Sequence, residues 1–330
     1  MQCLIKDKNN QSDINGYGSV DHNFLIQQCF VSCEEYANFL NSINIVYKNH
    51  DLNNEYIYKV IDKQRSVFKV KENIDPHSPI RYISLNHLKI YCNWLNTKNL
   101  KYLFEFPYNL YTNKSNLDQA EFWIPNYDEW YKAVYYDSSL EKYWLFPNKT
   151  NLPNKEQTLS PYGLIDAGFK YYTLLDNSAN IYAPKDKYII AGGATNRHPI
   201  NAKSGTIRYV SDKYYAGYIS GRLCKKSETK KFILKLYDTY GDGWGENSLC
   251  INNASHKPIY TNISLKNGYG PSSTTIEVDK IERNINIKYV KNNSLSYENY
   301  YEIYDFDTQL LIFKSNMYET PPENLIIALS

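Results

Sequence analysis

The chain has 330 residues, of which 42% are hydrophobic and 22% are charged, proportions that exclude a disordered protein. Its length is sufficient for two domains, each with its own hydrophobic core. With 37 basic and 35 acidic residues the net charge is +2, which excludes a strong electrostatic attraction to nucleic acid or to an anionic membrane.

The N-terminal residues, MQCLIKDKNNQSD, lack the apolar run of a signal peptide. No segment approaches the roughly 20 apolar residues of a membrane span. The six cysteines form no CxxC pair, which predicts free thiols in a reducing compartment. We therefore expect a protein made in the cytoplasm, without a membrane span and without a nucleic-acid partner.

Three helices are predicted in the first 140 residues, each by a capping signal followed by an apolar stripe. Ser32 with Glu35 and Asn126 with Glu129 form capping boxes, and Ser84 caps the middle helix. The stripes are Cys33, Tyr36, Ala37 and Leu40; Leu85, Leu88, Tyr91, Cys92 and Leu95; and Tyr127, Trp130, Ala133 and Val134. Irregular segments rich in Asn, Tyr and Pro separate them, which is a poor match for a sandwich, a barrel or a doubly wound sheet.

Several phrases in this region resemble the sulfatase-modifying-factor superfamily, which has the formylglycine-generating-enzyme-like fold. They are FVSCEEYANFLN from Phe30, SPIRYIS from Ser78, YCNWLN from Tyr91, FWIPNYDEWYKAVYYD from Phe122, SPYGLID from Ser160, AGGA from Ala191 and ISGRL from Ile219. They follow one another in the family's order. The resemblance implies a compact α+β domain, related to C-type lectins, over residues 1–226.

The sequence departs from the family pattern at the residues that the family uses for catalysis and for calcium binding. Its catalytic members carry redox-active or copper-binding cysteines shortly before the closing phrase, but residues 193–222 contain none, and Cys224 lies beyond that phrase. Ser or Thr cannot replace a thiolate as nucleophile or soft-metal ligand. The Asn and Glu that help to hold calcium in the family are also replaced, here by residues 168–173, GFKYYT.

The resemblance therefore implies a degenerate, non-catalytic domain, to which we assign no catalytic residue. The alternative is an oxidase or a formylglycine-type modifying enzyme with relocated cysteines. In that enzyme Cys224 would have to meet Cys33 or Cys92 in space.

An aromatic and basic set of residues is the candidate binding surface of residues 1–226. Tyrosine and arginine suit contacts with a protein or carbohydrate ligand. A codon bias toward Asn, Lys, Ile and Tyr, as in an AT-rich genome, is the competing explanation for any single one of the 34 tyrosines. The candidates are Tyr171, Tyr172, Arg197, His198, Arg208, Tyr209, Tyr214 and Tyr215.

In residues 227–330 the hydrophobic residues recur with a period of two, and Phe232, Leu234 and Leu236 are predicted to lie on one side of a strand. Further short alternating runs separated by Asn, Gly and Asp predict a C-terminal antiparallel β-sandwich. The phrases DTYGDGWGENSL from Asp238 and SYENYYEIYD from Ser296 resemble a sandwich module that recurs in surface proteins of bacteria and protists.

The DTYGDGW phrase has two interpretations. Asp-Gly pairs are common turn formers, so the phrase is consistent with a tight turn with Trp244 packed at the sheet edge. The other interpretation is a calcium loop that uses Asp238, Asp242, Asn247 and Glu298, although the spacing differs from that of an EF-hand. Calcium is the one cofactor that we expect under this second interpretation.

Together these features predict a non-catalytic binding or structural protein, a lectin-like pseudoenzyme domain joined to an adhesion-type module. The AT-rich composition and the missing leader also suggest a component of a large DNA virus particle, with other capsid or surface proteins as partners. This is a hypothesis about origin and setting.

Overall fold

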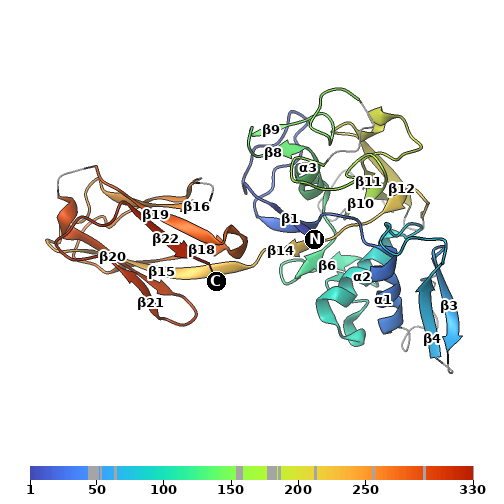
Figure 1. The fold of residues 1–330 in the computed structure, drawn as a ribbon, viewed down its shortest axis with the longest axis horizontal. Coiled ribbons are helices and arrows are strands. Elements are labelled where there is room, and N and C mark those ends of the chain that lie inside the picture. Colours follow the sequence, from blue (N-terminus) through green and yellow to red (C-terminus); the bar gives the residue numbers. More distant parts are fainter. Residues whose placement is uncertain are drawn as a thin grey trace. The chain divides into compact units, whose positions relative to one another are not determined.

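The computed structural model divides the chain into two compact units, Met1–Lys226 and Ser227–Ser330, each with its own core (Figure 1). The structure describes residues 1–43, 52, 54–62, 65–153, 159–176, 184, 187–211, 214–254, 256, 258–292 and 295–329. Within these residues the fold is mostly β, with three α-helices and several small sheets. None of the described helices has the length and apolar character that a membrane crossing requires.

The three helices of the first unit begin where the capping signals predict. Ser32 and Glu35 exchange hydrogen bonds, with Glu35 N donating to Ser32 Oγ at 3.1 Å and Ser32 N donating to Glu35 Oε2 at 2.7 Å. Ser84 Oγ accepts from the backbone N–H of His87. The helices are α1 (Cys33–Ile43), α2 (Leu85–Thr97) and α3 (Tyr127–Tyr135).

Helices α1 and α2 pack through the predicted apolar stripes. Tyr36 and Phe39 of α1 meet Tyr91 and Trp94 of α2 in a cluster of rings 5.3–6.1 Å apart. On the other side α1 contacts the hairpin formed by β3 (Ile57–Asp62) and β4 (Arg65–Val70), as Figure 1 shows. This aromatic packing makes the helices part of the main core of the unit.

Two four-stranded sheets organise the rest of the first unit. The first joins strands that lie far apart in sequence, because β2 pairs with β1 on one side and with β14 on the other. Its order is β1 (Gln2–Ile5), β2 (Phe24–Gln27), β14 (Cys224–Lys226) and β7 (Phe122–Trp123). The second has the order β12 (Ile207–Ser211), β11 (Lys187–Ala191), β10 (Tyr172–Leu174) and β13 (Ile219–Ser220).

Short hairpins and 3-10 turns complete the unit. The hairpins are β5 (Tyr108–Asn109) with β6 (Lys114–Ser115), and β8 (Tyr136–Asp137) with β9 (Lys142–Tyr143). The 3-10 turns are η1 (Leu100–Tyr102) and η2 (Pro199–Ala202).

Arg222, two residues before β14, is fully buried and ties three segments together. Its guanidinium donates to the carbonyl oxygens of Gln27, Gln28 and Ile165 at 2.8–3.0 Å. The same group lies 4.0 Å from the centroid of the Phe30 ring. Burial lowers the pKa of Arg222 to about 10, so it stays charged at neutral pH.

Glu129 has a similar role at the start of α3. Besides closing the capping box with Asn126, its carboxylate accepts from Trp123 Nε1 at 3.0 Å and lies 3.0 Å from His22 Nε2. Its side chain is only 4% exposed, so these partners replace solvent around the charge. Glu129 therefore links the start of α3 to β7 and to the segment just before β2.

The His22–Glu129 contact makes the stability of the first unit depend on pH. The hydrogen bond to Glu129 raises the pKa of His22 above its usual 6.5, so the stabilisation is complete below that value and is lost as pH rises through the raised pKa. Because the His22 side chain is 44% exposed, we expect a decrease of less than about 1 kcal/mol in unfolding free energy as pH rises from about 6 through the raised pKa. Urea unfolding across this range measures it.

A His22→Asn variant is the control, and its unfolding free energy should be flat over the same interval. Burial lowers the pKa of Lys132 to about 8, so this group adds a slope of opposite sign that sets in as pH approaches that value. A wild-type slope that persists in His22→Asn would contradict the assignment.

The second unit consists of two antiparallel four-stranded sheets with a common core. One has the order β18 (Ser272–Asp279), β15 (Thr229–Asp238), β20 (Asn299–Asp305) and β21 (Leu311–Lys314). The other has the order β17 (Pro258–Ile263), β16 (Ser248–Asn253), β19 (Asn284–Val290) and β22 (Asn324–Ala328). Two 3-10 turns, η3 (Lys280–Glu282) and η4 (Ser296–Glu298), precede β19 and β20.

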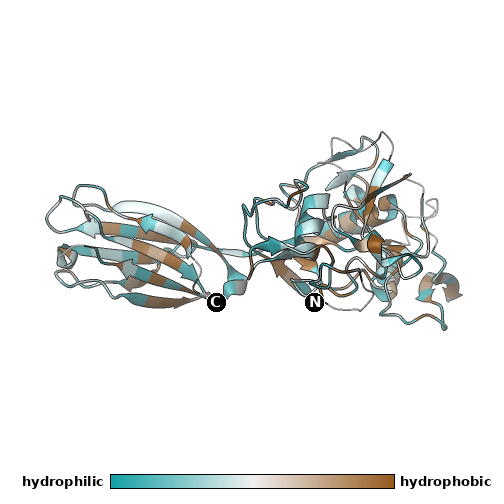
Figure 2. Cartoon of the chain, turned by 90° about the horizontal axis from the view of Figure 1, so that it is seen from above, coloured by the Kyte–Doolittle hydropathy of each residue, from teal (hydrophilic) through white to brown (hydrophobic). Residues whose placement is uncertain are grey.

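Hydrophobic and hydrophilic residues alternate along the strands of this unit (Figure 2), and the burial of side chains along β15 alternates in the same way. Phe232, Leu234 and Leu236 of β15 are buried, as predicted, and their neighbours are partly exposed. They share a core with residues of the opposite sheet, including Ile251 and Ile287. The two sheets therefore face each other through apolar side chains.

Candidate functional site

The predicted aromatic and basic cluster is partly assembled in the structure. Arg197 lies 5.5 Å from the ring of Tyr218, whose hydroxyl is hydrogen-bonded to that of Tyr214. Arg208 lies 5.5 Å from the ring of Tyr172, and Tyr172 meets Tyr218 edge to face. Tyr172 differs from the prediction, because it is 2% exposed in β10 and cannot present its ring to a ligand.

The other predicted residues of this set are dispersed. Tyr171 packs on Phe30 and beside Arg81. His198 caps η2, where its Nδ1 accepts from the Ile200 N–H at 3.2 Å. Tyr209 and Tyr215 are exposed at the surface. The cluster is thus a set of cation–π contacts rather than one continuous binding face.

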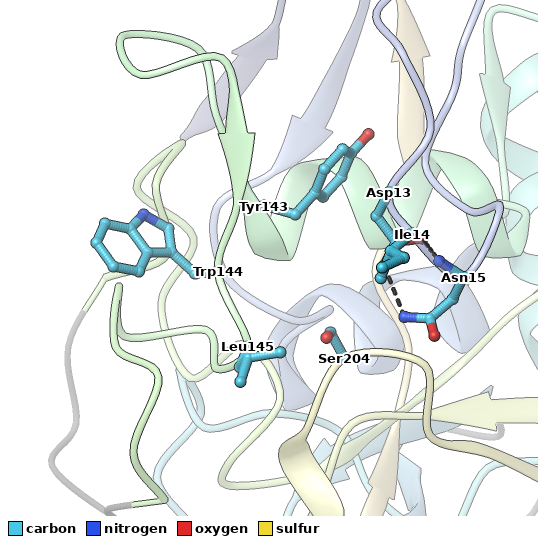
Figure 3. Close-up of a pocket in the computed structure, with 7 residues that line it drawn as sticks. All are labelled: Asp13, Ile14, Asn15, Tyr143, Trp144, Leu145 and Ser204. Atoms are coloured by element: carbon cyan, nitrogen blue, oxygen red, sulfur yellow. Dashed lines mark hydrogen bonds between the residues drawn. The ribbon is translucent and has the colours of Figure 1, made fainter.

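A hollow of about 230 Å³ lies elsewhere in the first unit, between the N-terminal loop and the β9 region (Figure 3). Figure 3 shows Tyr143 and Leu145 projecting toward the loop, with Trp144 pointing to the opposite side. Ile14 is fully exposed and Leu145 is 38% exposed, so the rim is apolar. The lining residues are Asp13, Ile14, Asn15, Tyr143, Trp144, Leu145 and Ser204.

Asp13 fixes the loop at this hollow. Its Oδ1 accepts from the N–H groups of Asn15 and Tyr17 at 2.8 and 3.1 Å, and its Oδ2 accepts from Asn15 Nδ2 and from the Tyr131 hydroxyl of α3. The Tyr143 hydroxyl is likewise bonded to the Gly18 carbonyl oxygen at 2.8 Å. The hollow is therefore preorganised, and its acidic group is already occupied by internal donors.

Three of the five thiols of the first unit are withdrawn from solvent, whereas Cys3 is partly buried and Cys29 is exposed. Cys33, Cys92 and Cys224 are buried free cysteines, and burial raises the pKa of each. Cys92 and Cys224 are close enough that charge on Cys92 would raise the pKa of Cys224 further. Cys92 Sγ donates to the Phe122 carbonyl oxygen at 3.3 Å, in the strand that pairs with β14. A buried, protonated thiol is a poor nucleophile and a poor metal ligand.

The acidic residues predicted in the second unit come together in part. One carboxylate oxygen from each of Asp238, Asp242 and Glu298 lies within 4.8 Å of the others. Asn247 is used differently, because its Oδ1 accepts from the Asn292 N–H at 2.9 Å. The cluster lies where β15 ends and β20 begins.

Sequence reasoning did not predict the hollow. Residues 13–15, 143–145 and 204 meet only after the chain has folded, and no local period marks them. The one available signal was the pair Asp13 and Asn15 in a Gly-rich polar turn, which is typical of an ordered loop.

No protein-family model and no curated protein matches the sequence. Three solved structures are similar at low identity. CarF has 13% identity and a TM-score of 0.48, with 69% of this chain and 98% of that chain covered. Variable protein 1 of Treponema denticola has 14% identity and a TM-score of 0.40, with 68% of this chain and 94% of that chain covered. PvdO from Pseudomonas aeruginosa has 13% identity and a TM-score of 0.38, with 68% of this chain and 90% of that chain covered.

Proposed function

We propose that the chain is a non-catalytic recognition protein. The first unit is a degenerate formylglycine-generating-enzyme-like domain, and the second is a β-sandwich module. The first unit binds part of a protein or carbohydrate ligand in the hollow beside Asp13. The motif resemblance over residues 30–223 supports the domain assignment, and the chemistry of the hollow supports the binding role.

The observation that carries the proposal is the lining of the hollow. It combines apolar side chains, Ile14 and Leu145, with aromatic and amide groups, as ligand pockets generally do. Its carboxylate already accepts four hydrogen bonds, so it positions the loop rather than serving as a free base. The lining contains no histidine, lysine or cysteine. Such a site holds a ligand but offers no free base that would activate the Ser204 hydroxyl as a nucleophile.

The modifying-enzyme alternative needs an accessible thiol pair. Cys92 and Cys224 both lie beside β7, since Cys92 Sγ donates to the Phe122 carbonyl oxygen and Cys224 pairs with Trp123, but both cysteines are 0% exposed. Copper or a peptide could reach them only after the first sheet opens, because Cys224 lies inside β14. The burial of this pair favours a structural role for it.

The binding role is tested with the full chain on arrays of oligosaccharides and peptides, followed by affinity measurement on the strongest hit. A double variant, Ile14→Ala with Leu145→Ala, should bind about tenfold more weakly, because it removes apolar area that the ligand would bury. Both side chains are exposed, so the fold should be unaffected. The matched control, Ile61→Ala with Leu152→Ala, removes the same exposed groups outside the hollow and should bind as wild type.

An equal loss of ligand affinity in both double variants would argue against the hollow as the binding site. Copper-dependent oxygen consumption on a Cys-containing peptide would argue for the modifying enzyme instead. The virus-particle setting stays a prediction from composition, and proteomics of purified particles tests it directly.

A further inference from the structure

Strand pairing in the second unit brings two acidic residues of distant sequence together. Asp238, the last residue of β15, is paired with Asn299, the first residue of β20. Glu298 immediately precedes Asn299, and its carbonyl oxygen accepts from the Thr239 N–H at 3.0 Å. The two carboxylates therefore meet at the same end of the sheet.

The loop after β15 returns the third carboxylate to this point. Asp238 Oδ1 accepts from the N–H groups of Tyr240 and Gly241, which closes a tight turn. Gly241 and Gly243 have φ of +87° and +88°, and a Cβ on Gly243 would lie 2.5 Å from the Lys266 carbonyl oxygen. Only glycine fits this path, and Asp242 lies between the two glycines.

The resulting group of oxygens lacks a positive partner among the described residues. Asp238 is 2% exposed, and its Oδ2 is buried without a hydrogen-bond donor. Within the described part of the chain no Lys, Arg or His forms an ion pair with Asp238, Asp242 or Glu298. The neighbouring Thr239 Oγ1 is also buried and without a partner. Buried polar groups are seldom left in this state.

We propose that Asp238, Asp242 and Glu298 bind one calcium ion. Calcium takes oxygen ligands at about 2.3–2.6 Å, so two oxygens on the same ion lie at most about 5 Å apart. The three carboxylates already satisfy this limit at 4.8 Å. Asp238 Oδ2 would gain the partner that it lacks, and backbone carbonyl oxygens and water would complete the coordination.

The ligand set selects the class of metal. It contains carboxylates and no thiolate or imidazole, which favours a hard cation over zinc or copper. Magnesium requires a small octahedral site and retains its water, whereas calcium accepts an irregular set of ligands from two loops. The three carboxylates bring like charges within 4.8 Å of one another, and a bound divalent cation would relieve this repulsion.

The test uses the full chain after treatment with chelator and dialysis. Calorimetric titration with CaCl₂ to about 10 mM covers the weak end of known calcium modules. We expect one ion per chain, and weaker binding of MgCl₂ under the same conditions. Asp242→Asn keeps the size of an exposed side chain and should weaken calcium binding at least about tenfold. Asp307→Asn, at an exposed acid in another loop of this unit, should bind as wild type.

A second readout follows folding. Calcium should raise the melting temperature of the second unit in the wild type and in Asp307→Asn, and much less in Asp242→Asn. Absence of saturable calcium binding, or equal binding by Asp242→Asn and wild type, would overturn the proposal. Neither result bears on the hollow in the first unit, so this inference and the proposed function fail separately.

Discussion

Replacing Arg222 by alanine is expected to lower the unfolding free energy of the first unit by about 3–5 kcal/mol. The substitution removes a fully buried guanidinium that donates to three carbonyl oxygens, those of Gln27, Gln28 and Ile165. The Gln28 carbonyl oxygen keeps the Ile165 N–H as a donor, but each carbonyl left unpaired in the interior costs about 1–3 kcal/mol, and the contact with the Phe30 ring is lost as well. The three contributions are coupled, so their sum is an upper limit.

Urea unfolding followed by far-ultraviolet circular dichroism measures the loss. Arg222→Lys keeps the charge but lacks the planar guanidinium with its several donors. Its unfolding free energy should therefore lie between those of Arg222→Ala and the wild type. Arg208→Ala, at an exposed arginine that contacts Tyr172 and Asn201, should lower stability by no more than about 1 kcal/mol. An alanine variant at position 222 as stable as Arg208→Ala would show that the three segments do not depend on this side chain.

Replacing Trp244 by alanine should destabilise the second unit by a similar amount, about 3–5 kcal/mol. Trp244 is 1% exposed, packs edge to face on Tyr289 and donates from Nε1 to the Tyr237 carbonyl oxygen at 2.7 Å. Its removal leaves a cavity between the sheets and an unpaired carbonyl. The effect should be confined to this unit, because Trp244 belongs to its separate core.

Differential scanning calorimetry of the full chain distinguishes the two transitions. The transition of the second unit should move to lower temperature in Trp244→Ala, while that of the first unit stays in place. Trp244→Phe keeps most of the apolar volume and should recover much of the loss. The control Tyr240→Ala removes a ring that is 62% exposed in the same loop and should have little effect. A shift of both transitions in Trp244→Ala would contradict independent cores.

Local signals predicted the helices and the strand pattern well. The capping boxes at Ser32 and Asn126 and the alternation through Leu234 depend on residues a few positions apart, and short-range rules describe them. The calcium-loop interpretation of the DTYGDGW phrase grouped Glu298 with Asp238 and Asp242, and the carboxylates of these three residues lie together in the structure. The helix starts and this strand therefore agree with the sequence analysis.

Features that depend on long-range contacts could not be predicted in the same way. The pairing of β2 with β14, the Glu129–His22 contact and the hollow beside Asp13 join segments more than 100 residues apart. Tyr172 was predicted to belong to a binding surface of tyrosines and arginines, but it lies in β10 and is 2% exposed. All three residues of β10 are buried, so no alternation along this strand distinguishes an exposed side from a buried one.

The position of β14 has a consequence for synthesis of the chain on the ribosome. Strands β1 and β2 are made within the first 27 residues, yet β2 acquires its second neighbour only when residues 224–226 emerge. Arg222, which satisfies the carbonyls of Gln27 and Gln28, arrives at the same stage. The first unit therefore cannot complete its sheet during most of its own translation, and nascent chains that end before Arg222 expose the β2 edge to proteases and chaperones.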